Sequence, residues 1–134
     1  MNNPSDLQIL SAIYDRYVDA FTESAEKSTE SLFKVYHPID IPSIAKELGM
    51  NRHILFGRLH YHLDAKYRYK DENDAWTHLF AMKVGDQRHC IHFPYVSAIV
   101  AEREREFRRY AVSLFGSALA IIISLISLFI KLHS

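Results

Sequence analysis

The apolar and polar positions of the chain divide it into a patterned N-terminal part and one uninterrupted apolar run. The run covers residues 111–130 and contains no charged side chain. At about 1.5 Å of rise per residue, a helix of this length spans roughly 30 Å, the thickness of the hydrocarbon core of a bilayer. A core helix of a small soluble domain would be expected to keep a polar face. We therefore predict a single transmembrane helix over residues 111–130.

The flanks of the run predict its orientation. Basic residues are concentrated just before it, as Arg103, Arg105, Arg108 and Arg109, whereas Lys131 follows it. An excess of lysine and arginine marks the cytoplasmic side of a membrane helix. The first residues have neither the basic start nor the long apolar core of a secretory signal peptide. The sequence therefore predicts a single-pass protein of the inner (cytoplasmic) membrane with its N-terminus in the cytoplasm.

The N-terminal part begins with an amphipathic pattern. Ser5 and Gln8 fit a capping box, which places the first helical residue at Asp6. Apolar residues then recur at spacings of three and four, with two more widening the stripe: Leu7, Leu10, Ile13, Tyr14, Tyr17, Val18 and Phe21. This periodicity predicts a helix that ends at about Ala25, followed by a short strand over residues 33–36.

Two alternating runs, residues 76–84 and 88–93, predict a β-hairpin. They meet at Gly85-Asp86-Gln87, a sequence typical of a tight turn. Pairing through this turn would put the following side chains on one apolar face: Trp76, His78, Phe80, Met82, Val84, His89, Ile91 and Phe93. We expect this face to cover the core of the domain.

The segment between these elements carries the pattern of two short helices joined by a tight turn. Gly49 suits a left-handed turn position, and Ala45 is small enough to let the two helices cross closely. Asn51 can cap the second helix, which is expected from Arg52 to about Ala65. The shared core would be formed by Ile44, Leu48, Leu55 and Leu59.

The order of helix, short strand, two helices, strand and hairpin resembles that of a winged helix-turn-helix domain, over roughly residues 6–94. The resemblance implies an α+β fold in which the second helix of the pair enters the major groove of DNA and the hairpin forms the wing. It also implies DNA-binding positions, which are Asn51, Arg52, His53, Phe56, Gly57 and His60 on the helix, with Lys83, Arg88 and His89 at or beside the wing tip. Phe56 and Gly57 stand where such families often place polar or basic side chains. A winged helix that binds a protein partner is therefore the alternative.

The last segment links this domain to the membrane. No helix-breaking residue separates the segment after Pro94 from the apolar run, so one helix of about 36 residues is expected to continue into the bilayer. We expect residues 1–94 to form the winged-helix domain, 95–110 a charged stalk helix, 111–130 the transmembrane helix and 131–134 a short tail.

Small side chains form a stripe along the predicted transmembrane helix, at Ser113, Gly116, Ser117, Ala120, Ser124 and Ser127. Small residues allow helices to approach closely, and serine hydroxyls can hydrogen-bond across such an interface. We expect the stripe to support a homodimer or a small homo-oligomer. The alternative is that the serines bond back to their own helix.

Composition narrows the chemistry. The 16 basic and 16 acidic residues balance, although residues 46–92 carry eight basic against six acidic residues, which permits a nucleic-acid partner. The single cysteine, Cys90, excludes an intrachain disulfide and agrees with a reducing compartment. His89 and Cys90 point to opposite faces of a strand, as do His89 and His92, so they do not form a zinc site together. Since phosphate-binding loops and nucleophile motifs are also missing, we expect no metal, no cofactor and no catalytic activity.

Two functions are compatible with these predictions. The favoured one is a membrane-tethered, bacterial-type regulatory protein that binds DNA, or a protein partner, at the cytoplasmic face of the membrane. The alternative is a small membrane effector of a phage-defence or toxin–antitoxin system. In that case, oligomers of the span would perturb the bilayer, and the winged helix would be a regulatory or partner-binding module.

Overall fold

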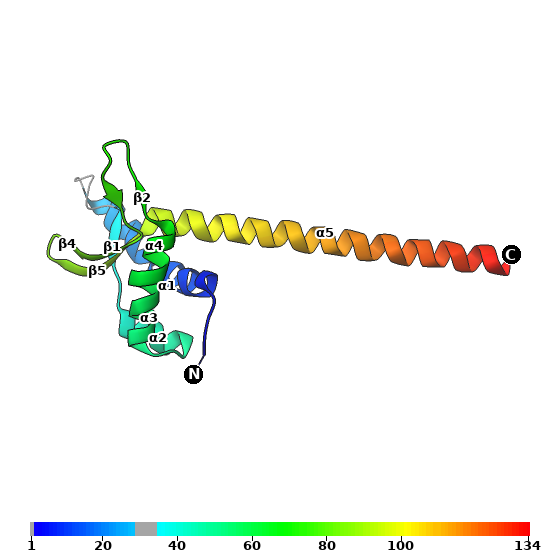
Figure 1. Ribbon diagram of the computed structural model, residues 1–134, viewed down its shortest axis with the longest axis horizontal. Coiled ribbons are helices and arrows are strands. Elements are labelled where there is room, and N and C mark those ends of the chain that lie inside the picture. The colour runs from blue at the N-terminus through cyan, green and yellow to red at the C-terminus, as the bar shows by residue number, and fades with distance from the viewer. Residues whose placement is uncertain (1, 29–34) are drawn as a thin grey trace. The chain divides into compact units, whose positions relative to one another are not determined.

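The computed structural model describes residues 2–28 and 35–134. The chain divides into two compact units, residues 1–100 and 101–134. The first unit combines helices with strands, and the second is helical throughout (Figure 1). The predicted α+β class is therefore confirmed.

Helix α1 (Asp6–Lys27) begins where the capping box predicted. The Ser5 hydroxyl accepts a hydrogen bond from the Gln8 amide at 3.2 Å, and the Gln8 side chain accepts one from the Ser5 amide at 2.7 Å. These bonds satisfy backbone donors that have no partner inside the helix. The helix continues two residues beyond the expected end at Ala25. The predicted strand at residues 33–36 falls partly outside the described residues, and strand β1 covers Tyr36–Pro38.

Helices α2 (Ile41–Leu48) and α3 (Arg52–Gly57) are joined by the expected tight turn. Gly49 has φ = 67°, a left-handed conformation that is easy for glycine and strained for other residues. Asp40 caps α2 by accepting from the Ser43 amide, and Asn51 caps α3 by accepting from the His53 amide at 2.8 Å.

The helical path of α3 does not stop at Gly57. It continues through η2 (Arg58–Leu63), which has wider π-helical turns, into α4 (Asp64–Tyr67), so it extends past the expected end at Ala65. Leu55, Leu59 and Leu63 are all fully buried at a spacing of four residues. The wider turn keeps residues spaced by four closer to one face than a regular α-helix does.

The strands form two antiparallel sheets. The larger has the order β1-β5-β4, with β4 covering Phe80–Val84 and β5 covering Gln87–His92. Val84 pairs with Gln87 across a two-residue turn, in which Gly85 has φ = 58°. The smaller sheet pairs β2 (Tyr69–Lys70) with β3 (Trp76–Thr77).

The predicted hairpin is correct in its turn and wrong in its first strand. The run 76–84 is broken at His78 and Leu79, so β3 pairs with β2 in the other sheet. Two residues expected on the apolar face, Trp76 and Met82, are 53% and 45% exposed. The break has a physical cause, because Asp64 accepts hydrogen bonds from the Leu79 and Phe80 amides at 2.9 and 3.2 Å.

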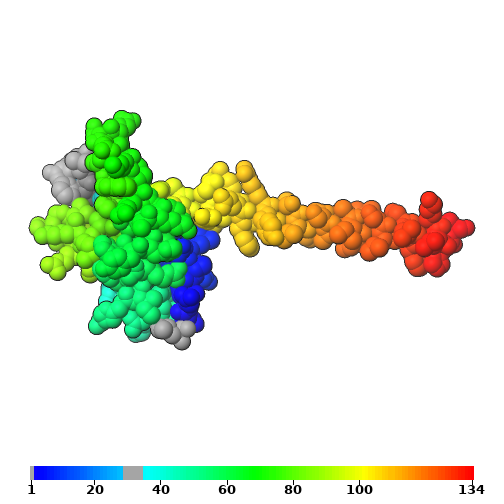
Figure 2. All heavy atoms as spheres, viewed as in Figure 1, coloured from blue at the N-terminus to red at the C-terminus, as the bar shows by residue number. Residues whose placement is uncertain are grey.

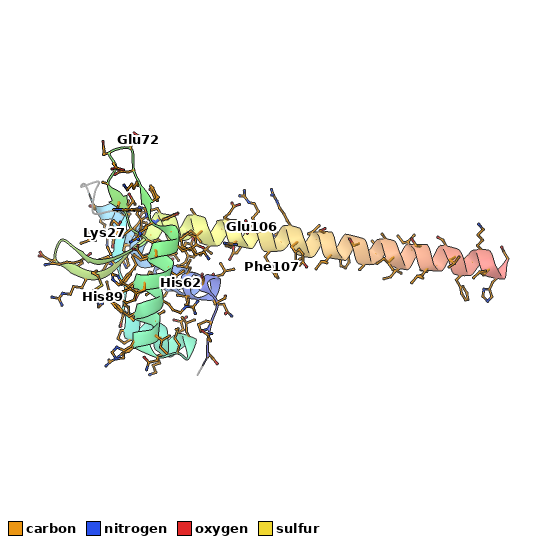
Figure 3. The ribbon with its side chains drawn as sticks, viewed as in Figure 1. Lys27, His62, Glu72, His89, Glu106 and Phe107 are labelled. Atoms are coloured by element: carbon orange, nitrogen blue, oxygen red, sulfur yellow. The ribbon has the colours of Figure 1, made fainter. Side chains whose placement is uncertain are left out.

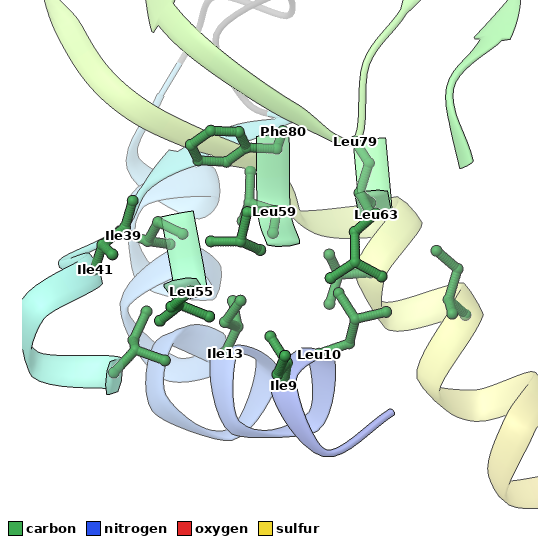
Figure 4. Close-up of a cluster of buried hydrophobic side chains, with 14 of the residues drawn as sticks. Ile9, Leu10, Ile13, Ile39, Ile41, Leu55, Leu59, Leu63, Leu79 and Phe80 are labelled. Carbon is green, nitrogen blue, oxygen red and sulfur yellow. The ribbon is translucent and has the colours of Figure 1, made fainter. Parts of the chain in front are cut away.

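The core of the first unit is one cluster of aliphatic and aromatic side chains (Figure 4). It joins α1, the α3–η2 helix and the start of β4, with these residues fully or almost fully buried: Ile9, Leu10, Ile13, Leu55, Leu59, Leu63, Leu79 and Phe80. Phe93 adds ring stacking on Tyr14 and Phe21, at centroid distances of 5.6 and 4.6 Å. This burial supplies the main stabilisation of the fold.

Helix α5 (Phe93–His133) is a single helix of 41 residues. Its first turns bury Phe93, Val96, Ile99 and Val100. Residues 101–134 are exposed along their whole length, and Figure 2 shows the C-terminal turns, in orange and red, as a bare helix. The helix is long and apolar enough to cross a membrane, with a mean hydropathy of 2.4 in its most apolar stretch. The predicted continuous helix is confirmed, with more residues than expected.

Candidate nucleic-acid interface

The N-terminal turn of α3 presents two cationic or cationisable side chains to solvent. Arg52 and His53 are both exposed, whereas the side chain of Asn51 is occupied as the helix cap. Arg52 has no ion-pair partner among the described residues. It is therefore available to an anionic ligand, as expected for a residue that meets phosphates or base edges.

Phe56 is placed differently from the other predicted residues of α3. Its half-buried ring lies 6.0 Å from the Phe80 ring and 5.8 Å from the His89 ring, in tilted or edge-on contacts. These contacts fasten α3 to the β4–β5 hairpin. Gly57 has open space where a Cβ atom would be, so the helix backbone is accessible there.

His60 and His89 extend this aromatic contact. The His60 ring stacks on Phe56 at 5.6 Å, and its Nδ1 is buried without a hydrogen-bond partner among the described residues. The His89 ring stacks on Phe80 at 6.2 Å, and the His89 backbone has a positive φ of 54°. Figure 3 labels His89 beside the β4–β5 hairpin. Both histidines therefore pack between the α3–η2 helix and the β4–β5 hairpin.

Lys83 and Arg88 face each other across the hairpin. They are cross-strand partners, both exposed, and neither has an ion-pair partner among the residues that the structure describes. Like charges placed directly opposite each other destabilise a strand pair. An anionic partner would relieve this repulsion, so the hairpin is suited to contact phosphates.

A hollow of about 240 Å³ lies between α2, α3 and the hairpin. Ile41, Pro42 and Phe56 provide its apolar lining, and Arg52, His53 and His89 complete it. The structure therefore brings the first turn of α3 and residue His89 of β5 to one place. Lys83 and His60 line a different groove, between η2 and β4.

Three other basic residues, on η2 and α4, already have an acidic partner. Arg58, His62 and Lys66 all bind the carboxylate of Asp6 at the start of α1, at 2.5, 2.9 and 3.4 Å. Partial burial alone would raise the pKa of Asp6, but the hydrogen bonds from His62, Arg58 and Lys66 lower it. These residues hold α1 against the helix and are not free to bind an anion.

Asp64 was not predicted as a site residue from the sequence, and His78 was predicted only as part of the apolar face of the hairpin. Asp64 is a buried carboxylate, 3% exposed, and its Oδ2 lies 2.8 Å from Nδ1 of His78. The carboxylate is thus satisfied by a side chain and two backbone amides, as a buried charge requires. The available signal was an acidic residue directly after Leu63, the last apolar position of the stripe that includes Leu55 and Leu59.

Cys90 lies in the centre of the larger sheet and is fully buried. Burial raises the pKa of its thiol, so the thiol stays protonated near neutral pH. No group of three potential metal-ligating side chains comes together within residues 2–28 and 35–134.

The serines of the apolar part of α5 bond to their own helix. The hydroxyls of Ser117, Ser124 and Ser127 donate to carbonyls four residues earlier, at 2.9–3.1 Å. These bonds would satisfy the hydroxyls inside a bilayer, and they do not prevent the small side chains from approaching another helix.

Comparison with known proteins does not assign the chain to a family. No protein-family model, curated protein or solved structure matches this chain.

Proposed function

We propose that the chain is a membrane-tethered winged-helix protein that binds duplex DNA at the cytoplasmic face of the membrane. The observation that carries this proposal is the set of three exposed cations without acidic partners: Arg52 at the start of α3, and Lys83 and Arg88 opposite each other on the hairpin. Such cations gain most from a polyanion, because they release counterions from its phosphates.

The order of the elements supports the same proposal. The elements follow one another as they do in winged helix-turn-helix domains. The order is helix α2, a left-handed turn at Gly49, helix α3, and then the β4–β5 hairpin, whose strand β5 pairs with β1. The β2–β3 hairpin is an addition between the helix and the wing. Arg52 and His53 would approach the bases, and Lys83 and Arg88 would hold the backbone.

A parallel dimer held by α5 belongs to this proposal. A two-fold symmetric DNA site is bound by two copies of a DNA-binding domain, and pairing of two α5 helices would bring two copies together. The small-residue stripe also favours a second candidate, the membrane effector. Expression of the full chain should then arrest growth and depolarise cells, whereas a DNA-binding regulator with a passive anchor should do neither.

DNA binding can be measured with the full chain in maltoside micelles and a fluorescent duplex. Because each protomer offers about three phosphate-binding cations, the salt slope should be shallow, about −3 per protomer. Arg52→Gln and Arg88→Gln should each weaken binding and reduce that slope by about one. Lys27→Gln is the control, since Lys27 is an exposed cation at the far end of α1 that already pairs with Glu23.

The outcomes separate the candidate partners. No binding at low salt would overturn the DNA proposal and favour a protein partner for the same surface. Binding that the Arg52 and Arg88 variants leave unchanged would show that DNA contacts another surface.

A further inference from the structure

A groove of the first unit lies outside the predicted DNA-binding positions on α3. It has a volume of about 600 Å³ and runs between the η2–α4 helix and strand β4. Small-molecule sites commonly have volumes of about 300–1,000 Å³. The groove is therefore large enough for a ligand of the size of a nucleotide.

The charges in this groove favour an anion. Arg68 lies just beyond the end of α4 and Lys83 lies on β4, and neither has an acidic partner among the described residues. Asp64, the acid of the groove, is 3% exposed and already accepts three hydrogen bonds, from the Leu79 amide, the Phe80 amide and His78. The negative charge of Asp64 is therefore largely shielded from a ligand, whereas the positive charges of Arg68 and Lys83 are exposed.

His78 adds a donor. Its Nδ1 is held by Asp64 at 2.8 Å, and its side chain is 41% exposed and lines the groove. The other ring nitrogen, Nε2, has no hydrogen-bond partner among the described residues and is left for a ligand. Asp64 thus orients a histidine that can donate to a phosphate oxygen.

The walls of the groove favour an aromatic group. Tyr61 on η2 is 74% exposed and Met82 on β4 is 45% exposed, and both line the groove. Ala65 and Ala81 are small, which leaves room between the helix and the strand. A flat ring placed there would cover two large apolar side chains that the fold leaves in water.

We propose that this groove binds a free nucleotide, with its phosphates held by Arg68, His78 and Lys83 and its base between Tyr61 and Met82. The groove shares Lys83 with the proposed DNA surface, so a bound nucleotide would compete with DNA for this cation. The site would make DNA binding responsive to a small ligand, and nucleotide binding itself does not depend on the DNA proposal.

The test uses the full chain in maltoside micelles, which carry no phosphate, with ATP as the probe and amide NMR as the readout. ATP should shift the amides of residues 78–83 in a saturable way, and adenosine, which has no phosphate, should not. Arg68→Gln and Lys83→Gln should each weaken ATP binding about tenfold, the effect of losing a hydrogen bond to a charged group. Lys27→Gln should bind ATP as the wild type does.

Two results would overturn the proposal. The first is the absence of amide shifts at ATP concentrations up to about 5 mM, since a dissociation constant above that concentration would be too weak for a specific site. The second is ATP binding that Arg68→Gln leaves unchanged. Because the Arg68 variant keeps Arg52 and Arg88, its DNA binding reports on the proposed function separately.

Discussion

His37 shows how one residue couples the fold to pH. Its ring packs against Tyr17, Phe21 and Phe93, at centroid distances of 5.3, 6.2 and 6.3 Å. Burial among these rings lowers the pKa of His37, because the charged imidazolium loses hydration there. Burial likewise lowers the pKa of His92, whose Nδ1 accepts a hydrogen bond from the Tyr95 amide at 3.2 Å.

The lowered pKa values of His37 and His92 predict that the folded state loses stability in mild acid. A histidine whose pKa is lowered by folding binds its proton more readily when unfolded, so the free energy of unfolding falls as pH drops below about 6.5. Each histidine can contribute at most about 1.4 kcal/mol per pH unit. We expect the first unit of the full chain to melt at a lower temperature at pH 5 than at pH 7, by near-ultraviolet circular dichroism.

A variant isolates the contribution of His37. His37→Phe keeps the aromatic packing and removes the titrating group, so its melting temperature should depend less on pH than that of the wild type. His53→Phe, at an exposed position, is the control and should keep the wild-type dependence. An unchanged pH dependence in His37→Phe would contradict this explanation.

At the scale of elements, local signals in the sequence were sufficient to predict helix starts and turns. The capping box of α1, the left-handed glycine after α2 and the glycine turn of the β4–β5 hairpin each depend on a few adjacent residues. The break between β3 and β4 could not be predicted in this way. It depends on Asp64, which precedes the affected amides by 15 and 16 residues.

The candidate interface was predictable to a similar extent. The exposure of Arg52, Lys83 and Arg88 follows from their positions in the patterns of α3 and the hairpin. The burial of Phe56 does not, because it depends on contacts with Phe80 and His89 from strands more than 20 residues away. Side chains that join elements distant in the sequence are invisible to periodicity.

The apolar part of α5 carries an element-scale prediction about self-association. Replacing Ser117, Ala120 and Ser124 with isoleucine keeps the span apolar and removes the close approach that small residues permit. We expect this triple variant to insert into membranes and to lose crosslinked dimers. Ala118→Ile adds bulk away from the stripe and should keep them. Dimers that persist in the triple variant would show that the serines bond to their own helix and do nothing more.

At the scale of the whole molecule, the two units have different surfaces. Residues 1–100 enclose an apolar core, whereas residues 101–134 expose apolar side chains on every face of a helix. Large exposed apolar surfaces in a stable protein mark contact with a membrane or a partner. With the arginines before the apolar run, this division agrees with the proposal that the chain is held at the membrane and acts through its first unit.

Co-flotation tests the central claim most directly. The full chain is reconstituted into phosphatidylcholine vesicles, mixed with a fluorescent DNA duplex at low salt, and separated on a density gradient. We predict that protein and DNA float together with the vesicles. The DNA, but not the protein, should be lost at high salt and in a variant carrying Arg52→Gln and Arg88→Gln. Protein that floats without DNA would contradict the proposed function, and protein that stays at the bottom of the gradient would contradict the membrane anchor itself.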